Sequence, residues 1–178
     1  MRRRLVLVSG APGSGKTTLA APLAGALRYP LFSKDYLKET LVRALGGGGD
    51  LLTTRKLGGA AMETMWMLAA HAPQAVLEAN FRPRSDYERG KLASLDADIV
   101  EVYCDCGPDE AARRFAARAD SEGHDRSTHP LTALTPELLA EYDRPIGLGD
   151  LLRVDTRHPV DIQDVARRIE AAMNGSRG

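Results

Sequence analysis

The chain has 178 residues, of which 43% are hydrophobic, and its 24 basic and 24 acidic residues give a formal net charge of zero. This length and hydrophobic content suit one globular domain with a full core, so we expect a single domain over residues 1–178. The balanced charge lacks the basic surplus of a general nucleic-acid binder, which makes nucleic acid an unexpected partner.

A basic run, Arg2 to Arg4, precedes an apolar stretch at residues 5–8. That stretch is too short for a membrane span or for the apolar region of a removable signal peptide. The expected location is therefore the cytoplasm, with no membrane partner. Cys104 and Cys106 alternate on a predicted strand, which favours buried thiols over a disulfide or a zinc site.

The first predicted strand, at residues 5–8, leads through residues 10–18 into a helix expected at 16–28, although Pro22 lies inside that helix. The connection reads Gly-Ala-Pro-Gly-Ser-Gly-Lys-Thr-Thr and fits the phosphate-binding loop pattern G-x-x-x-x-G-K-[ST]. Such a loop requires a strand before it and a helix after it, and this context is present here. The sequence therefore predicts nucleotide binding.

Each part of this loop suits a polyphosphate for a physical reason. The glycines let successive N–H groups point inward toward an anion, and the following helix adds the partial positive charge of its N-terminus. Lys16 supplies a cation for the β- and γ-phosphates, and the hydroxyl of Thr17 is a hard oxygen ligand suited to Mg²⁺. The predicted nucleotide-binding residues of the loop are Gly10, Gly13, Ser14, Gly15, Lys16, Thr17 and Thr18.

Farther along the chain, strand-like runs alternate with helix-forming runs, which predicts an α/β layer fold with a largely parallel sheet. Helices on either side of a glycine run form a helical insertion, or cap, over about residues 36–72, and residues 120–135 lack an apolar period and are predicted to be a lid. Further strands are expected at residues 29–33, 74–79, 97–105 and 151–155, and further helices at 36–45, 53–71, 85–95, from 108 onward, at 136–142 and at 162–173.

Ligands of such sheets bind at the carboxyl ends of the strands. Gly10, Asp35, Asn80 and Asp105 all lie at such ends in the predicted fold. Asp35 could orient an acceptor group opposite the phosphate loop, where a perturbed acid is expected, or it could cap the helix that follows. One residue could serve both purposes.

These motifs resemble those of the P-loop small-molecule kinases, which include gluconate kinase, shikimate kinase, chloramphenicol phosphotransferase, the kinase domain of polynucleotide kinase and uncharacterised AAA-type predicted kinases. The likeness covers nearly the whole chain, through GAPGSGKTT, FSKD, VLEANFRPR, VYCDCGPDEAARRFAAR and LLRVDTRHPV. It implies a P-loop NTPase fold with a five-stranded parallel sheet in the order 2-3-1-4-5, a helical cap and an arginine-bearing lid. It also implies ATP and Mg²⁺ as cofactors.

The resemblance assigns roles to particular residues. In similar kinases an aspartate at the end of the second strand orients the acceptor hydroxyl or accepts its proton, a role that falls on Asp35. An R-x-x-x-R pattern at the lid entrance falls on Arg114 and Arg118, where the first arginine packs on the adenine and the second reaches the phosphates. Arg126 is a second lid candidate for nucleotide binding, and the alternative for these arginines is a solvated helix face or loop.

The acceptor side is expected near the end of the third strand. Glu78 takes the place of an acidic residue that holds Mg²⁺ through water in many phosphate-loop proteins. Arg82 could clamp an anionic or polar group of the acceptor, or it could be an exposed loop arginine. Trp66 and the neighbouring methionines could line an acceptor pocket but fit an ordinary core better. The predicted substrate-binding residues are Asp35, Glu78, Asn80 and Arg82.

These residues favour an ATP-dependent kinase that moves the γ-phosphate to a hydroxyl of a small molecule, with Lys16, Asp35 and Arg118 as catalytic residues and Thr17 as the metal ligand. One alternative is a nucleotide-dependent switch or regulatory ATP-binding protein. A GTPase switch would need an N-K-x-D motif, whose only near match comes far too early in the sheet, and the length excludes the further helical domain of an AAA-type motor.

A second alternative is a kinase of nucleic-acid 5′-hydroxyl ends. It would need a basic channel, which Arg82, Arg84 and Arg89 could form despite the neutral overall charge. The identity of the acceptor and the oligomeric state, monomer or homodimer, stay open.

Overall fold

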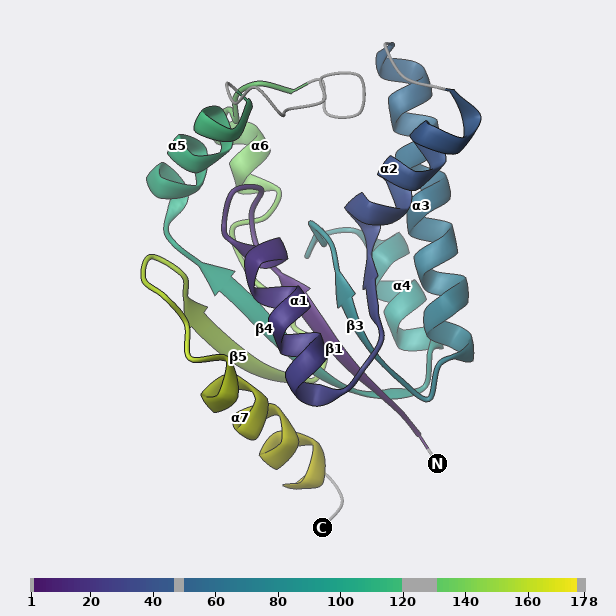
Figure 1. Cartoon of the computed structure of the whole chain (residues 1–178), viewed down its shortest axis with the longest axis vertical. Coiled ribbons are helices and arrows are strands. Elements are labelled where there is room, and N and C mark those ends of the chain that lie inside the picture. Colours follow the sequence, from purple (N-terminus) through teal and green to yellow (C-terminus); the bar gives the residue numbers. More distant parts are fainter. Residues whose placement is uncertain (1, 47–49, 120–130, 176–178) are drawn as a thin grey trace.

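The computed structural model describes residues 2–46, 50–119 and 131–175. All strand pairs within these residues are parallel, and they form a single sheet in the order β2-β3-β1-β4-β5 (Figure 1). This order confirms the P-loop NTPase topology expected from the motifs. The strands are β1 (Arg3–Ser9), β2 (Leu31–Ser33), β3 (Gln74–Glu78), β4 (Ala97–Asp105) and β5 (Asp150–Asp155).

Helices cover both faces of this sheet (Figure 1). On one face, α1 (Lys16–Leu27) and α7 (Ile162–Gly175) enclose one apolar core with the strands. On the other, α3 (Leu51–His71) and α4 (Asp86–Ser94) enclose a second core. The remaining helices are α2 (Lys34–Leu45), α5 (Pro108–Ala119) and α6 (Pro136–Ala140).

The central strand β1 is buried on both faces, as a strand in the middle of a parallel sheet should be. Val6 and Val8 point into the core under α1 and α7, while Leu5 and Leu7 point into the core under α3 and α4. Each of these four side chains has 0% exposure, which stabilises the fold by about 1.5–3 kcal/mol per side chain. The phosphate-binding loop therefore follows directly on the central strand of the sheet, which is buried on both faces.

The helical insertion is present as α2 and α3, which pack side by side (Figure 1), but both helices begin earlier than the predicted residues 36 and 53. Ser33 caps α2 by accepting a hydrogen bond from the backbone N–H of Tyr36, and Asp50 caps α3 in the same way from Thr53. Asp35 therefore lies inside the first turn of α2. The alternative that Asp35 is the N-cap of this helix is wrong.

Two predicted segments fall wholly or partly outside the described residues. Gly46 ends α2 in the left-handed conformation at φ +62°, and residues 47–49 of the glycine run are not described. Residues 120–130 of the predicted lid, and Arg126 with them, also lie outside the described residues. Within the parts of the chain that are described, no helix combines the length and the apolar character needed to cross a membrane.

Candidate active site

The loop between β1 and α1 requires glycine for two separate reasons. Gly10, Gly13 and Gly15 have φ angles of +133°, +82° and +86°, a region that side chains disfavour. A Cβ on Gly10 would lie 2.5 Å from the carbonyl oxygen of Cys104, and one on Gly13 would lie 2.2 Å from that of Ala111. The loop thus lies directly against the backbone at the end of β4 and in the first turn of α5.

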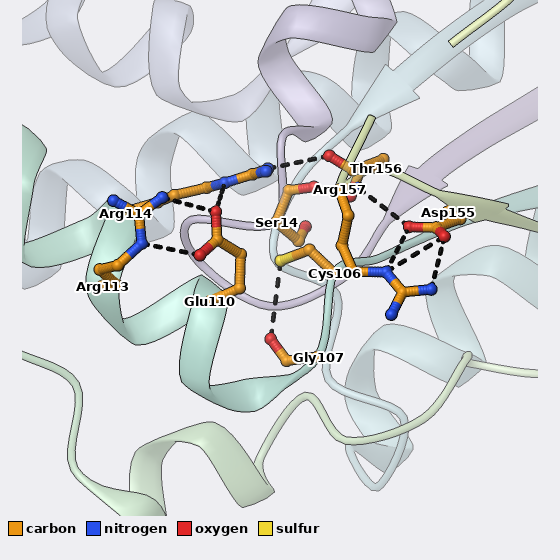
Figure 2. A network of polar contacts seen from close by, with 9 residues as sticks. All are labelled: Ser14, Cys106, Gly107, Glu110, Arg113, Arg114, Asp155, Thr156 and Arg157. Carbon is orange, nitrogen blue, oxygen red and sulfur yellow. Dashed lines mark hydrogen bonds and ion pairs between the residues drawn. The ribbon is translucent and has the colours of Figure 1, made fainter. Parts of the chain in front are cut away.

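Thr156, which follows β5, is hydrogen-bonded to the phosphate-binding loop. Its hydroxyl donates to the carbonyl oxygen of Ser14 at 2.7 Å, and its backbone N–H donates to the carbonyl oxygen of Asp105 at 3.0 Å. Thr156 is buried, and it lies beside Ser14 and Cys106 in the polar network of Figure 2. The turn after β5 therefore holds the phosphate loop in position. Cys104, at the end of β4, is a buried thiol as predicted, and burial raises the pKa of its thiol to about 12.

Lys16, the first residue of α1, is 6% exposed, and its Nζ donates to the carbonyl oxygen of Ala11 at 2.8 Å. Burial lowers the pKa of Lys16, while the carboxylates of Glu78 and Asp35 oppose that shift and Arg118 adds to it. The structure therefore brings Lys16 within electrostatic reach of all three charged side chains. A bound polyphosphate would add negative charge and keep the ammonium group protonated.

Glu78, at the end of β3, joins the phosphate loop to the start of α2. Its Oε1 accepts a hydrogen bond from the Thr17 hydroxyl at 3.2 Å, and its Oε2 accepts one from the Ser33 hydroxyl at 2.5 Å. Glu78 is 2% exposed. The structure thus brings Glu78 against Thr17, whereas Thr18 is exposed on α1 and Asn80 is half-buried after β3.

Asp35 is half-buried in the first turn of α2, and its Oδ1 accepts a hydrogen bond from Nζ of Lys34 at 3.0 Å. The Lys34 side chain passes close to α3 at Gly58, where a Cβ would lie 4.0 Å from Cε of Lys34. The contact with Lys34 therefore helps to fix the position of the Asp35 side chain at the start of α2.

The two arginines of the R-x-x-x-R pattern on α5 face different partners. Arg114 donates from Nε to Glu110 at 2.5 Å and from Nη1 to the carbonyl oxygen of Thr156 at 3.0 Å, which ties α5 to the turn that braces the loop (Figure 2). Arg118 is exposed, and its guanidinium lies 5.4 Å from the ring centre of Phe115. Arg118 is the member of the pair that also acts electrostatically on Lys16.

Arg82 and Arg84, in the loop after β3, reach across to the segment that follows α6. Arg82 donates to Glu141 at 2.8 Å, and its guanidinium lies 6.0 Å from the ring centre of Tyr142. Arg84 makes a bidentate pair with Asp143, at 2.9 Å for each bond. An acceptor anion at Arg82 would therefore have to compete with Glu141.

Glu101 is a structural carboxylate that sequence reasoning missed. It has 0% exposure within β4, and it accepts hydrogen bonds from the Ser9 hydroxyl at 2.5 Å and from the backbone N–H groups of Ile146 and Gly147, each at 2.9 Å. It thereby fastens the residue before the phosphate loop to the turn that leads into β5. The available signal was a charged residue inside an apolar strand run, which implies hydrogen-bonding partners.

The aromatic and methionine cluster of α3 is mainly core, the alternative that the sequence favoured. Met65 and Trp66 are 0% and 3% exposed, and the ring of Trp66 packs 5.9 Å from that of Phe81. Met67 points outward and is 52% exposed. Met65 and Trp66 therefore belong to the second core, under α3 and α4, and Met67 does not.

Residues 5–138 match the AAA domain family. The chain belongs to this family. The matched segment of the AAA domain family contains Lys16, Asp35, Glu78 and Arg118, whereas Thr156 lies beyond it. The resemblance to P-loop kinases that the motifs suggested is thereby confirmed at the level of family and fold.

Known relatives carry kinase descriptions. Cytidylate kinase of Pyrobaculum arsenaticum (strain DSM 13514 / JCM 11321 / PZ6) is 31% identical over 125 residues, which are 64% of this chain and 60% of that protein. This chain thus spans about 60% of the length of that curated relative. A proposed kinase from Chloroflexus aurantiacus j-10-fl superposes with a TM-score of 0.83 at 27% identity, over 97% of this chain and 99% of that one.

A more distant structure shares the fold alone. The Mycobacterium tuberculosis APS kinase CysC, solved with AMPPNP and APS, gives a TM-score of 0.62 at 20% identity, over 97% of this chain and 98% of that one. The fold shared with this structure therefore extends over nearly the whole chain.

Replacing Glu110 with glutamine is expected to weaken the fold in a pH-dependent way. Hydrogen bonds from Arg113 and Arg114 lower the pKa of Glu110 from 4.5 to about 2. A carboxylate with a lowered pKa stabilises the folded state above its unfolded pKa, and this contribution is lost as the pH falls through the folded value. Glu110→Gln should therefore lower the melting temperature at pH 7, and the difference from wild type should shrink between about pH 4.5 and 2.

Thermal unfolding followed by circular dichroism across this pH range measures the effect. Glu170→Gln, at an exposed position on α7, is the matched control and should give no such trend. A difference between Glu110→Gln and wild type that stays constant with pH would contradict the prediction.

Proposed function

We propose that this protein is an ATP-dependent kinase that transfers the γ-phosphate to a hydroxyl group of a small molecule. The observation that carries the proposal is the glycine loop between β1 and α1, beside which the Thr17 hydroxyl donates a hydrogen bond to Glu78 at 3.2 Å. Phosphoryl transfer depends mainly on positioning and charge stabilisation, so it needs a polyphosphate site with an acceptor-orienting group opposite. Membership of the AAA domain family supports the nucleotide half of this proposal.

Mg²⁺ would be held by Thr17 and, through water, by Glu78. The Thr17 hydroxyl and Oε1 of Glu78 are 3.2 Å apart, and both are oxygen donors of the kind that Mg²⁺ prefers. Mg²⁺ usually takes few protein ligands and completes its shell with phosphate oxygens and water. The bound ion would neutralise charge that develops on the β- and γ-phosphates.

The other residues divide the work of binding and transfer. Lys16 would hold the β- and γ-phosphates, and Arg118 would approach the transferring group. Asp35 would accept a hydrogen bond from the acceptor hydroxyl and take its proton as the new O–P bond forms and the bond to ADP breaks. Arg114, held between Glu110 and Thr156, would pack its planar guanidinium on the base of the nucleotide.

A second candidate acceptor is a nucleoside monophosphate, which would receive the phosphoryl group on a phosphate oxygen. The cytidylate kinase of Pyrobaculum arsenaticum, at 31% identity over 125 residues, favours this possibility. A nucleic-acid end is disfavoured because Arg82 and Arg84 are paired with Glu141 and Asp143, and Arg89 donates to the carbonyl oxygen of Ile146. These arginines are already engaged, which weakens the case for a basic channel.

The test is a screen for ADP release above the background ATPase rate, with hydroxylated metabolites, antibiotics and nucleoside monophosphates including CMP as acceptors. We expect one hydroxylated compound class to raise ADP release and to gain one phosphoryl group by mass spectrometry. Response to nucleoside monophosphates alone would move the acceptor to a phosphate oxygen. ATP hydrolysis that no acceptor stimulates would contradict a kinase and favour a nucleotide-dependent switch.

A further inference from the structure

Ser33 is a buried hydroxyl that touches both halves of the proposed site. It is the last residue of β2, it is 2% exposed, and it lies opposite Glu78 in the parallel register of β2 and β3. Its hydroxyl donates to Oε2 of Glu78 at 2.5 Å and accepts a hydrogen bond from the backbone N–H of Tyr36 at 3.5 Å. The Ser33 hydroxyl therefore donates a hydrogen bond to Glu78 on β3 and accepts one from the backbone of α2.

On the phosphate side, Ser33 determines how the Glu78 carboxylate is turned. Because Oε2 is bound by Ser33, Oε1 is left facing the Thr17 hydroxyl at 3.2 Å. Groups that orient a metal-binding side chain typically affect metal affinity about 10–100-fold when they are removed. Ser33 is therefore placed to tune how well Glu78 serves a cation at Thr17.

On the acceptor side, Ser33 is the N-cap of α2. A capping side chain holds the first turn of a helix, because it satisfies a backbone N–H group that has no partner within the helix. Asp35 belongs to that first turn. The position of the Asp35 backbone therefore depends on the same hydroxyl that orients Glu78.

We propose that Ser33 is a positioning residue that couples the two halves of the site, because its hydroxyl both turns Glu78 toward the phosphate loop and holds the helix turn that presents Asp35. The inference rests on the proposed function. Thr17 and Glu78 would hold Mg²⁺ with the nucleotide, and the bond from Ser33 to Glu78 would then also restrain the first turn of α2, which carries Asp35. A residue that merely capped α2 would leave the Mg²⁺ dependence of nucleotide binding untouched.

The chain offers a matched control for the capping role. Ser85 caps α4 by accepting a hydrogen bond from the backbone N–H of Glu88 at 3.2 Å, on a helix that packs against the sheet under the second core. Ser33→Ala and Ser85→Ala therefore each remove one helix cap, but only the first removes a bond to Glu78. If the two variants differ in how nucleotide binding depends on Mg²⁺, the difference is due to the lost bond between Ser33 and Glu78.

The experiment measures AMPPNP affinity by calorimetry with Mg²⁺ and with EDTA in its place. Ser33→Ala should raise the Mg²⁺ concentration needed for half-maximal binding about tenfold. Its affinity for AMPPNP in EDTA should stay within about twofold of wild type, because the loop amides and Lys16 are unchanged. Ser85→Ala should match wild type in both conditions, and Ser33→Thr, which keeps the hydroxyl, should restore the Mg²⁺ response.

Hydrogen–deuterium exchange gives a second measurement that needs no acceptor. In wild type, Mg²⁺ with AMPPNP should slow exchange in the first turns of α2, and Ser33→Ala should lose this added protection while Ser85→Ala keeps it. If Ser33→Ala does not fold, Ser33→Cys takes its place, since a thiol is a weaker donor of similar size and should change both measurements in the same direction.

Equal Mg²⁺ dependence and equal protection of α2 in Ser33→Ala and wild type would overturn the coupling. Failure of the wild-type protein to bind AMPPNP with Mg²⁺ would overturn both the coupling and the proposed function. If Ser33→Ala loses the Mg²⁺ response as expected but the wild-type protein turns over no acceptor, the proposed function is overturned and the role of Ser33 stands.

Discussion

Lys16→Met should abolish phosphoryl transfer, with a loss of at least about 10³-fold in kcat/KM for ATP. The buried ammonium of Lys16 is a charge that the site can place against the β- and γ-phosphates, and burial makes such an interaction stronger than it would be in water. Methionine keeps most of the length of the side chain and removes the charge. Steady-state kinetics with the acceptor found in the screen measures the loss.

The melting temperature of Lys16→Met shows whether activity is lost because the charge is missing or because the protein no longer folds. Burial lowers the pKa of Lys16, which means that the folded protein bears a cost for keeping this group charged. The melting temperature of Lys16→Met should therefore be no lower than that of wild type. Lys91→Met, at an exposed pair with Glu63, should leave kinetics unchanged, and turnover by Lys16→Met within tenfold of wild type would rule out the assigned role.

Asp35→Asn should leave ATP binding within about twofold of wild type and lower kcat by at least about 10²-fold. The asparagine keeps the shape of the side chain but cannot accept the proton that leaves the acceptor hydroxyl. It also removes the negative charge that pairs with the Lys34 ammonium at 3.0 Å, although the amide oxygen can still accept the hydrogen bond. Calorimetry with AMPPNP measures binding, and single-turnover kinetics with saturating acceptor measures the chemical step.

Asp86→Asn is the control for the charge of a helix first turn. Asp86 lies in the first turn of α4 as Asp35 lies in that of α2, so both substitutions remove a carboxylate that favours a helix N-terminus. Only Asp35→Asn should reduce kcat. Equal turnover by Asp35→Asn and wild type would remove Asp35 from the reaction.

The fold could be predicted from the sequence because its signals are local. The phosphate loop between an apolar strand and a helix, together with the motif resemblance, gave the sheet order that the structure has. The helix expected at residues 85–95 is α4 in the structure, Asp86–Ser94. Lys16 and Thr17 were assigned from a short pattern whose spacing is itself the geometry of the loop.

The parts that could not be predicted depend on contacts between residues distant in the chain. The bond from Ser33 to Glu78 spans 45 positions and that from Arg82 to Glu141 spans 59, and no periodicity reports either pairing. The role of Glu101 is of the same kind, because its partners are contributed by β1 and by the turn before β5. Such bonds exist only once the sheet has brought these segments together.

The bond from the Thr156 hydroxyl to the Ser14 carbonyl has a practical consequence for anyone trimming this protein. The family match ends at residue 138, yet Thr156, whose hydroxyl bonds to the phosphate-binding loop, lies beyond it. A protein truncated to the matched segment would keep every residue of the phosphate-binding loop but would lose the hydrogen bond from Thr156 that holds it. A unit produced for ligand work therefore has to extend past Thr156, and it should include α7 because this helix encloses one core of the sheet together with α1.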